Sequence, residues 1–111
     1  MSKLNTLQQR IRDCLLLDSY GSLLSDKQYS ACEMILLQDL SLAEAAEGLS
    51  VSRQGVHELL TRARENMETY EVSLKLLKKN LLVEEMTQML EDNRNSLPED
   101  FYNKFKKILT I

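Results

Sequence analysis

The sequence predicts an all-α protein, and three observations support this fold class. Apolar residues recur at spacings of three and four along most of the chain. Leucine is abundant and runs of β-branched residues are absent. Only three glycines and one proline interrupt 111 residues. We therefore expect a single helical domain over residues 1–111, with about five or six helices around one modest core and with one helix much longer than the others.

The first two helices follow from local signals. The first is expected from about residue 4 to residue 20, where apolar residues repeat every three or four positions. The second begins at Ser25, because Ser25 and Gln28 have the S-x-x-Q pattern of a capping box, and it extends to about Leu37.

The stretch from Ser41 to Arg64 has the pattern of a helix-turn-helix. Ser41 and Glu44 form a second capping box, which begins a short helix that ends near residue 48. Ala45 and Ala46 are small enough for another helix to cross this one closely. Ser52 is the expected N-cap of the helix that follows the turn.

The second helix of this motif carries the candidate contacts to nucleic acid, because its N-terminal end faces base edges in DNA-binding versions of the motif. Arg53 is suited to guanine and Gln54 to adenine, and a solvated first turn is the alternative. For Arg62 and Arg64 the alternative is pairing with nearby glutamates, and for His57 it is a surface or packing role. The predicted nucleic-acid-binding residues are Ser52, Arg53, Gln54, His57, Arg62 and Arg64.

Charge weighs against strong binding of duplex DNA. Residues 25–68 carry four basic and eight acidic groups, whereas residues 1–24 sum to +1 and residues 69–111 to zero. Most nucleic-acid-binding proteins have an excess of Lys and Arg, which neutralises phosphates. The helix-turn-helix thus lies in the most acidic part of a chain whose net charge is −3.

The longest helix is expected to run from Ser52 to a bend near Asn80. Its apolar residues follow one another at spacings of 4, 3, 4, 3, 4, 3 and 4, as in a coiled-coil seam: Val56, Leu60, Ala63, Met67, Tyr70, Leu74, Leu77 and Leu81. This seam packs either against other helices of the same chain or, in part, against a second copy in a homodimer.

The C-terminal helices are expected within residues 81–111. One runs from about residue 81 to Glu91, and a polar loop follows it. Ser96, Pro98 and Glu99 then indicate the start of a last helix, with Ser96 and Glu99 as a capping box. Its expected apolar face comprises Phe101, Phe105, Ile108 and Leu109.

Several classes of protein are disfavoured. No apolar run approaches the ~18 residues of a membrane span, and the N-terminus lacks the apolar segment of a signal peptide, so we expect a cytosolic protein. Cys14 and Cys32 are expected to be reduced core thiols. One histidine without a cysteine cluster predicts no metal site. No arrangement of carboxylates with a nucleophile or base suggests an enzyme, and no glycine-rich loop suggests a cofactor.

Four segments together carry a resemblance to known proteins: Leu24–Gln28, Ser41–Glu47, Val51–Val56 and Arg62–Glu71. They resemble region 4 of sigma factors, and more closely the YlxM-like family of small bacterial helix-turn-helix proteins, which are named as signal recognition particle-associated. The chain departs from sigma-like motifs at three positions. Ser50 stands where the turn usually has glycine, whereas Gly48 and Gly55 stand in the helices. The tail from Asn93 onward matches less well.

The resemblance implies an all-α, sigma region 4-like fold and a regulatory or accessory role in the cytosolic signal recognition particle pathway. The implied partners are the particle's RNA, its GTPase and the receptor. Three functions remain open: a nucleic-acid-binding accessory protein, a protein-interaction module with the helix-turn-helix as scaffold, and a DNA-binding transcriptional regulator. The interaction module would present Glu33, Asp39, Glu44 and Glu47 to a basic protein surface.

Overall fold

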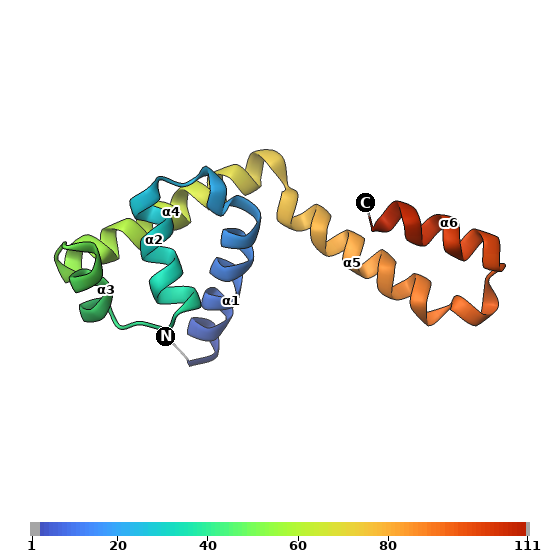
Figure 1. Cartoon of the computed structure of the whole chain (residues 1–111), viewed down its shortest axis with the longest axis horizontal. Helices are drawn as coiled ribbons and strands as arrows, with labels where there is room; N and C mark the ends of the chain where they lie inside the picture. The colour runs from blue at the N-terminus through green and yellow to red at the C-terminus, as the bar shows by residue number, and fades with distance from the viewer. Residues whose placement is uncertain (1–2, 111) are drawn as a thin grey trace. The chain divides into compact units, whose positions relative to one another are not determined.

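The computed structural model describes residues 3–110, and within them it is all-helical with no strand, which confirms the predicted fold class (Figure 1). There are also three short helical segments: η1 (Gly21–Leu23) and η3 (Arg94–Ser96) are 3-10 turns, and η2 (Glu33–Leu37) is a π-helical turn that continues the second helix. The six α-helices are α1 (Lys3–Tyr20), α2 (Asp26–Cys32), α3 (Leu42–Leu49), α4 (Arg53–Leu74), α5 (Leu76–Asp92) and α6 (Glu99–Leu109).

The chain divides into two compact units, Met1–Lys75 and Leu76–Ile111. The first, which we call the motif unit, contains α1 to α4. The second, the hairpin unit, contains α5 and α6. The single domain over residues 1–111 stays a prediction.

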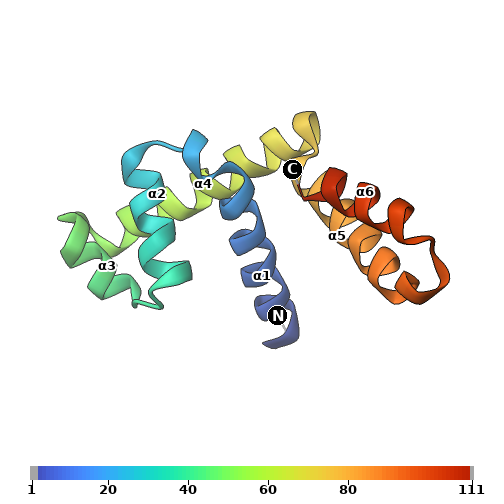
Figure 2. The same ribbon diagram turned by 45° about the vertical axis from the view of Figure 1, so that its right-hand side comes forward.

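Helix α4 is the central element of the motif unit, and α1, α2 and α3 all pack against it (Figure 2). Three residues of the predicted seam, Val56, Ala63 and Met67, are buried in this packing. The other buried apolar residues come from the three surrounding helices: Leu16, Leu17, Tyr20, Ala31, Cys32, Ala45 and Ala46. This part of the seam is therefore covered within the chain.

Both predicted capping boxes of the motif unit are confirmed. The Gln28 backbone N–H donates to Ser25 Oγ at 3.2 Å, and the Ser25 N–H donates to Gln28 Oε1 at 3.2 Å. Ser41 and Glu44 exchange the same two bonds at 3.1 Å each. Since each box satisfies two backbone donors at a helix start, the starts of α2 and α3 are fixed by their own residues.

The end of the second helix is held by α1. The last turn of this helix, η2, is π-helical, and backbone N–H groups of the loop that follows donate to its first two carbonyl oxygens at 2.9 Å. Arg10 Nη2 of α1 donates to the carbonyl oxygen of Ile35 at 2.9 Å and pairs with Asp39 Oδ1 at 3.0 Å. A guanidinium at this position also interacts favourably with the negative end of the helix dipole.

The predicted end of the longest helix is wrong. Helix α4 ends at Leu74, because Lys75 adopts a left-handed backbone with φ 56° and ψ 32°. Asn80, the expected bend, lies inside α5. Apolar spacing reports which side chains share a face, but it does not register a single residue that leaves the helical conformation. The seam from Val56 to Leu81 therefore does not run along one helix.

The predicted start of the last helix is also wrong. Ser96 lies in η3, and Pro98 is the N-cap of α6, with the first helical bond from the Tyr102 N–H to the Pro98 carbonyl at 3.0 Å. Proline restricts the residue before it to an extended backbone, and Leu97 has φ −106° and ψ 144°. The helix therefore begins after the proline, and Ser96 does not cap it.

The expected apolar face of the last helix needs a correction as well. Tyr102 is the buried residue of α6, whereas Phe101 and Ile108 are exposed and Phe105 and Leu109 are half-buried. The expected face was chosen for apolar residues alone. Tyr102 turns inward because its hydroxyl has an acceptor, Glu91 Oε1 of α5, at 2.6 Å.

The two cysteines are free thiols in different surroundings: Cys14 is half-buried and Cys32 is buried. Burial, and secondarily the negative charge of Asp13, raises the pKa of the Cys32 thiol to about 11. Because the thiolate is the reactive form, Cys32 should be inert in the folded protein.

We expect iodoacetamide at about pH 8 to alkylate Cys14 of the folded chain well before Cys32, since Cys32 is both buried and protonated at that pH. Peptide mass spectrometry over time would measure both rates. In denaturant the two rates should converge. Equal rates in the native protein would contradict the described packing of Cys32.

Candidate nucleic-acid interface

The helix-turn-helix is formed by α3, a three-residue turn and the first part of α4. Ser50 adopts a left-handed backbone with φ 57° and ψ 42°. The Ser50 N–H donates to the Glu47 carbonyl at 3.2 Å and the Val51 N–H to the Ala46 carbonyl at 3.0 Å. These two bonds form a Schellman motif, which usually has glycine at the left-handed position. The missing turn glycine therefore leaves the turn intact but strained.

The predicted cap of the second helix is confirmed, since the Gly55 N–H donates to Ser52 Oγ at 2.9 Å. A side chain at residue 55 would be crowded there, because an added Cβ would lie 3.2 Å from Ser52 Oγ. The glycine of α3 is similar: a Cβ at Gly48 would lie 3.3 Å from Met34 Cε. Both unusual glycines thus fit close local packing.

A small apolar cluster sets the crossing of the two helices. Ala45 and Ala46 of α3 are buried against Val56 of α4, and Val51 of the turn packs on the same cluster. The alanines bring the two backbones close, as the sequence predicted. This packing fixes the direction in which the first turn of α4 points.

The first turn of α4 presents polar side chains that the protein itself does not use. Arg53, Gln54 and His57 are exposed. Among the side chains of residues 6–110, none of the three forms an ion pair or a side-chain hydrogen bond. The first turn carries no acidic residue. The backbone N–H groups of Arg53 and Gln54 also lack helical acceptors, so this end of α4 favours an anion.

The predicted contact residues do not share one face of α4. Helical geometry of about 100° per residue places Arg53 and His57 on the same flank, with Gln54 beside them. Arg62 follows Arg53 by nine positions, which puts it on the opposite side of the helix and roughly 13 Å along its axis. Glu58, four residues after Gln54, brings a negative charge to the outward face.

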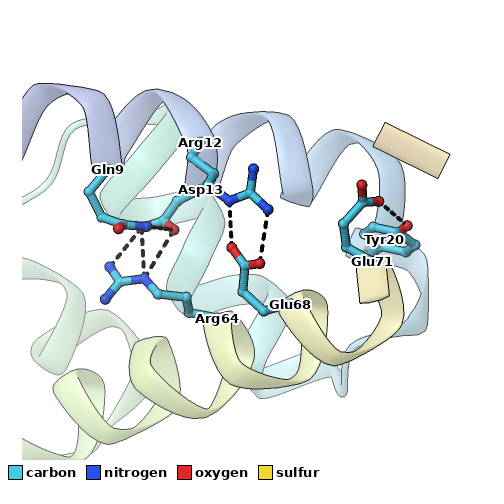
Figure 3. Close-up of polar contacts among 7 residues, drawn as sticks. All are labelled: Gln9, Arg12, Asp13, Tyr20, Arg64, Glu68 and Glu71. Carbon is cyan, nitrogen blue, oxygen red and sulfur yellow. Dashed lines mark hydrogen bonds and ion pairs between the residues drawn. The ribbon is translucent and has the colours of Figure 1, made fainter. Parts of the chain in front are cut away.

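Arg64 forms an ion pair inside the motif unit. Its Nη2 lies 2.7 Å from Asp13 Oδ2 of α1, and its Nε lies 3.0 Å from Asp13 Oδ1 (Figure 3). Asp13 is the buried charged residue of the described core, 5% exposed, and it also accepts from Gln9 Nε2 at 2.9 Å. The hydrogen bond to Asp13 raises the pKa of the Arg64 guanidinium further.

Two more polar contacts join the same helices (Figure 3). Arg12 of α1 donates to both carboxylate oxygens of Glu68 in α4, at 2.6 and 2.9 Å. This hydrogen bond lowers the pKa of Glu68. Tyr20 donates through its hydroxyl to Glu71. Sequence reasoning missed all three contacts, because each joins residues more than fifty positions apart and no local spacing indicates such pairs.

Other features offer little for a cofactor or metal. A cavity of about 630 Å³ lies between α1 and α2 and is lined by the carboxylates of Asp18 and Asp26 and by no basic residue, so it does not suit a phosphate. In the described part of the chain, no three His, Cys, Asp or Glu residues are grouped to hold a metal ion. No described helix is both long and apolar enough to span a membrane.

The chain is similar to a defined set of bacterial proteins. The sequence profile of the family described as "Putative helix-turn-helix protein, YlxM / p13 like" matches residues 7–108. A UPF0122 protein of Caldanaerobacter subterraneus subsp. tengcongensis is 48% identical over 77 residues, which cover 69% of this chain and 63% of that relative. UPF0122 proteins of Clostridium kluyveri and Clostridium botulinum are 39% and 36% identical, covering 85% and 93% of this chain and 85% and 97% of the relatives.

We expect Ser50→Gly to stabilise the protein by about 0.5–1 kcal/mol, because glycine removes the left-handed strain but loses more entropy on folding. The thermal midpoint should rise by roughly 2–8 °C. Ser50→Ala keeps the strain and should bring no gain. If alanine stabilised the chain as much as glycine, the described turn conformation would be wrong.

Arg64→Ala should destabilise the fold by about 2–4 kcal/mol, since it leaves the buried Asp13 carboxylate without its cation. Denaturant titration followed by circular dichroism would measure this loss. Arg62→Ala is the matched control, because this exposed arginine has no ion pair with any side chain of residues 6–110, and it should change stability by no more than ~0.5 kcal/mol. Similar losses in the two variants would contradict the structural role of Arg64.

Proposed function

Because this chain belongs to the YlxM/p13-like family of helix-turn-helix proteins, we propose that it is a nucleic-acid-binding accessory protein. The contact surface in this proposal is the first turn of α4. Ser52 and Gln54 would contact phosphate or base edges, and Arg53 and His57 would contact them from the adjoining flank.

One observation carries the proposal. The arginines of the motif unit differ in what they contact. Arg10, Arg12 and Arg64 are each held by an acidic partner of the same unit. Arg53 is not, and it lies at the end of a 22-residue helix where free backbone donors and the dipole also favour an anion. Arg62, on the opposite flank, would reach only a neighbouring phosphate.

The acidic surroundings of this surface predict moderate affinity. Glu58 lies beside Gln54, and the region around the motif has more acidic than basic groups. We therefore expect binding that weakens steeply with salt and relies on few phosphate contacts. Such binding suits an accessory protein that acts together with other components better than it suits an autonomous promoter reader.

Association with the signal recognition particle pathway stays a prediction that the family resemblance carries, and a cytosolic location goes with it. The particle's RNA is the partner that best joins this prediction to the proposed surface. An acidic docking surface for the GTPase or the receptor has less support. Glu44 is used in a capping box and Asp39 pairs with Arg10, which leaves Glu33 and Glu47 of the four carboxylates.

Arg53→Ala should weaken binding to the particle's RNA or to duplex DNA by about 1–3 kcal/mol, which is roughly 5- to 150-fold. Fluorescence anisotropy across a salt series would measure the affinity. The slope of log affinity against log salt concentration should decrease in magnitude by about one, because one phosphate contact is lost. Lys27→Ala removes the same charge from an exposed site in α2 and should leave affinity nearly unchanged.

The two nucleic acids distinguish the remaining functions. Tighter binding to the RNA would favour the accessory role, and sequence-specific binding to DNA would favour a transcriptional regulator. No binding to either at low salt would overturn the proposal, as would equal losses in Arg53→Ala and Lys27→Ala. Binding to the particle protein in the absence of RNA would support the interaction module instead.

A further inference from the structure

The hairpin unit leaves large apolar side chains at its surface. On α5, Leu82, Met86 and Met89 are 48%, 41% and 60% exposed. On α6, Phe101 and Ile108 are 51% and 67% exposed. Single exposed apolar residues are normal, but a contiguous group of this size usually marks an interaction surface.

Each helix contributes a regular stripe to this surface. Leu82, Met86 and Met89 are separated by four and three residues, so they follow one face of α5. The apolar residues of α6, Phe101, Phe105 and Ile108, have the same spacing. The two phenylalanine rings stack, with centroids 5.7 Å apart, which keeps their edges along one line.

A polar cluster between α5 and α6 indicates on which side of the hairpin the two stripes lie. Tyr102 donates to Glu91 Oε1 at 2.6 Å, and Lys106 Nζ lies 3.1 Å from the same oxygen, so these groups bridge α5 and α6 on one side of the hairpin. At about 100° per residue, Leu82 and Met86 lie roughly 140–180° around α5 from Glu91.

The same geometry places Phe101 and Ile108 roughly 140–160° around α6 from Lys106. Helices α5 and α6 are antiparallel neighbours in both views (Figures 1 and 2). Both stripes therefore lie on the side opposite the polar cluster. Together they form a single apolar face, which we define as Leu82, Met86, Met89, Phe101, Phe105 and Ile108.

The hairpin unit is small for a structure with an uncovered apolar face. Leu77, Leu90 and Tyr102 are its buried residues among those described. Units below about 40 residues usually need disulfides, metals or oligomerisation. Both cysteines of the chain lie outside this unit, and no metal-ligand cluster is found in its described part.

We infer that the apolar face binds the same face of a second copy of this chain, so that two hairpins form a four-helix bundle. Spacings of three and four along antiparallel helices are those of bundle cores. A two-fold axis brings one patch onto its identical counterpart. Residues 76–111 carry six basic and six acidic groups, so two copies do not repel each other through net charge.

The charges at the edges of the face suit this pairing. The edge of the α5 stripe that lies away from α6 carries Lys78, Glu85 and Asp92, spaced seven residues apart, and the matching edge of the α6 stripe carries Lys104. A two-fold axis parallel to the helices sets α5 of one copy against α6 of the other. Glu85 and Asp92, which outnumber Lys78, then face Lys104 of the other copy, and this favours the arrangement over one that places like edges together.

The test is the oligomeric state of the full chain, which requires no nucleic acid and is therefore independent of the proposed function. Light scattering after size exclusion should give a dimer for the wild type and a monomer for Met86→Glu. Val72→Glu is the matched control: it places the same charge at a 76% exposed apolar residue of α4 and should stay dimeric. Circular dichroism should show native helix content in all three.

A second measurement covers the case in which Met86→Glu fails to fold. If unfolding is coupled to dissociation, the thermal midpoint of the wild type rises with protein concentration. At about 100 μM even a weak dimer would be largely formed. A wild type that is still monomeric at that concentration would overturn the proposal, and the apolar face would then bind something other than a second copy. A dimeric Met86→Glu, or an equally disruptive Val72→Glu, would also overturn it.

Discussion

The ion pair between Asp13 and Arg64 is the interaction on which the motif unit depends. A buried carboxylate is tolerated only when a cation and hydrogen bonds compensate its lost hydration. Arg64 and Gln9 supply both, and Asp13 can therefore face the core between α1 and α4. The pairs of Arg12 with Glu68 and of Tyr20 with Glu71 extend the contact along the same two helices. These three polar contacts fix the position of α1 along α4, whereas apolar packing alone would allow the two helices to slide past each other.

Helix α4 has three separate roles along one rod. One face, with Val56 and Ala63, completes the core. The flank that carries Arg64 binds α1. In the first turn, the side chains of Arg53 and Gln54 have no partner in the described protein. The backbone of this turn is held in place by the tight crossing of α3. Since a binding surface is only as well placed as its support, the alanines under the turn matter to function as much as the exposed side chains do.

The two proposals assign different work to the two units. The motif unit would bind nucleic acid weakly, because its contact residues are few and its surroundings acidic. The hairpin unit would join two copies of the chain. A dimer would carry two weak nucleic-acid-binding surfaces. When both can bind the same nucleic acid, the dimer binds more tightly than one copy, because binding of the first surface raises the effective concentration of the second surface. Dimerisation would thus compensate for the charge that disfavours a single motif.

The sequence by itself determined the helical class, the starts of α2, α3 and α4, and the tight crossing in the helix-turn-helix. Those features depend on neighbours a few residues apart, such as Ser41 with Glu44 or Ser52 with Gly55. It also selected Arg53 and Gln54 as candidate contacts, which stay predictions. The tertiary structure decided the rest: that Arg64 is held by Asp13, that α4 ends at Lys75, and that Tyr102 faces inward. Each of these features depends on a residue far away in the sequence or on a single residue with a left-handed backbone. Apolar periodicity carries no information about either.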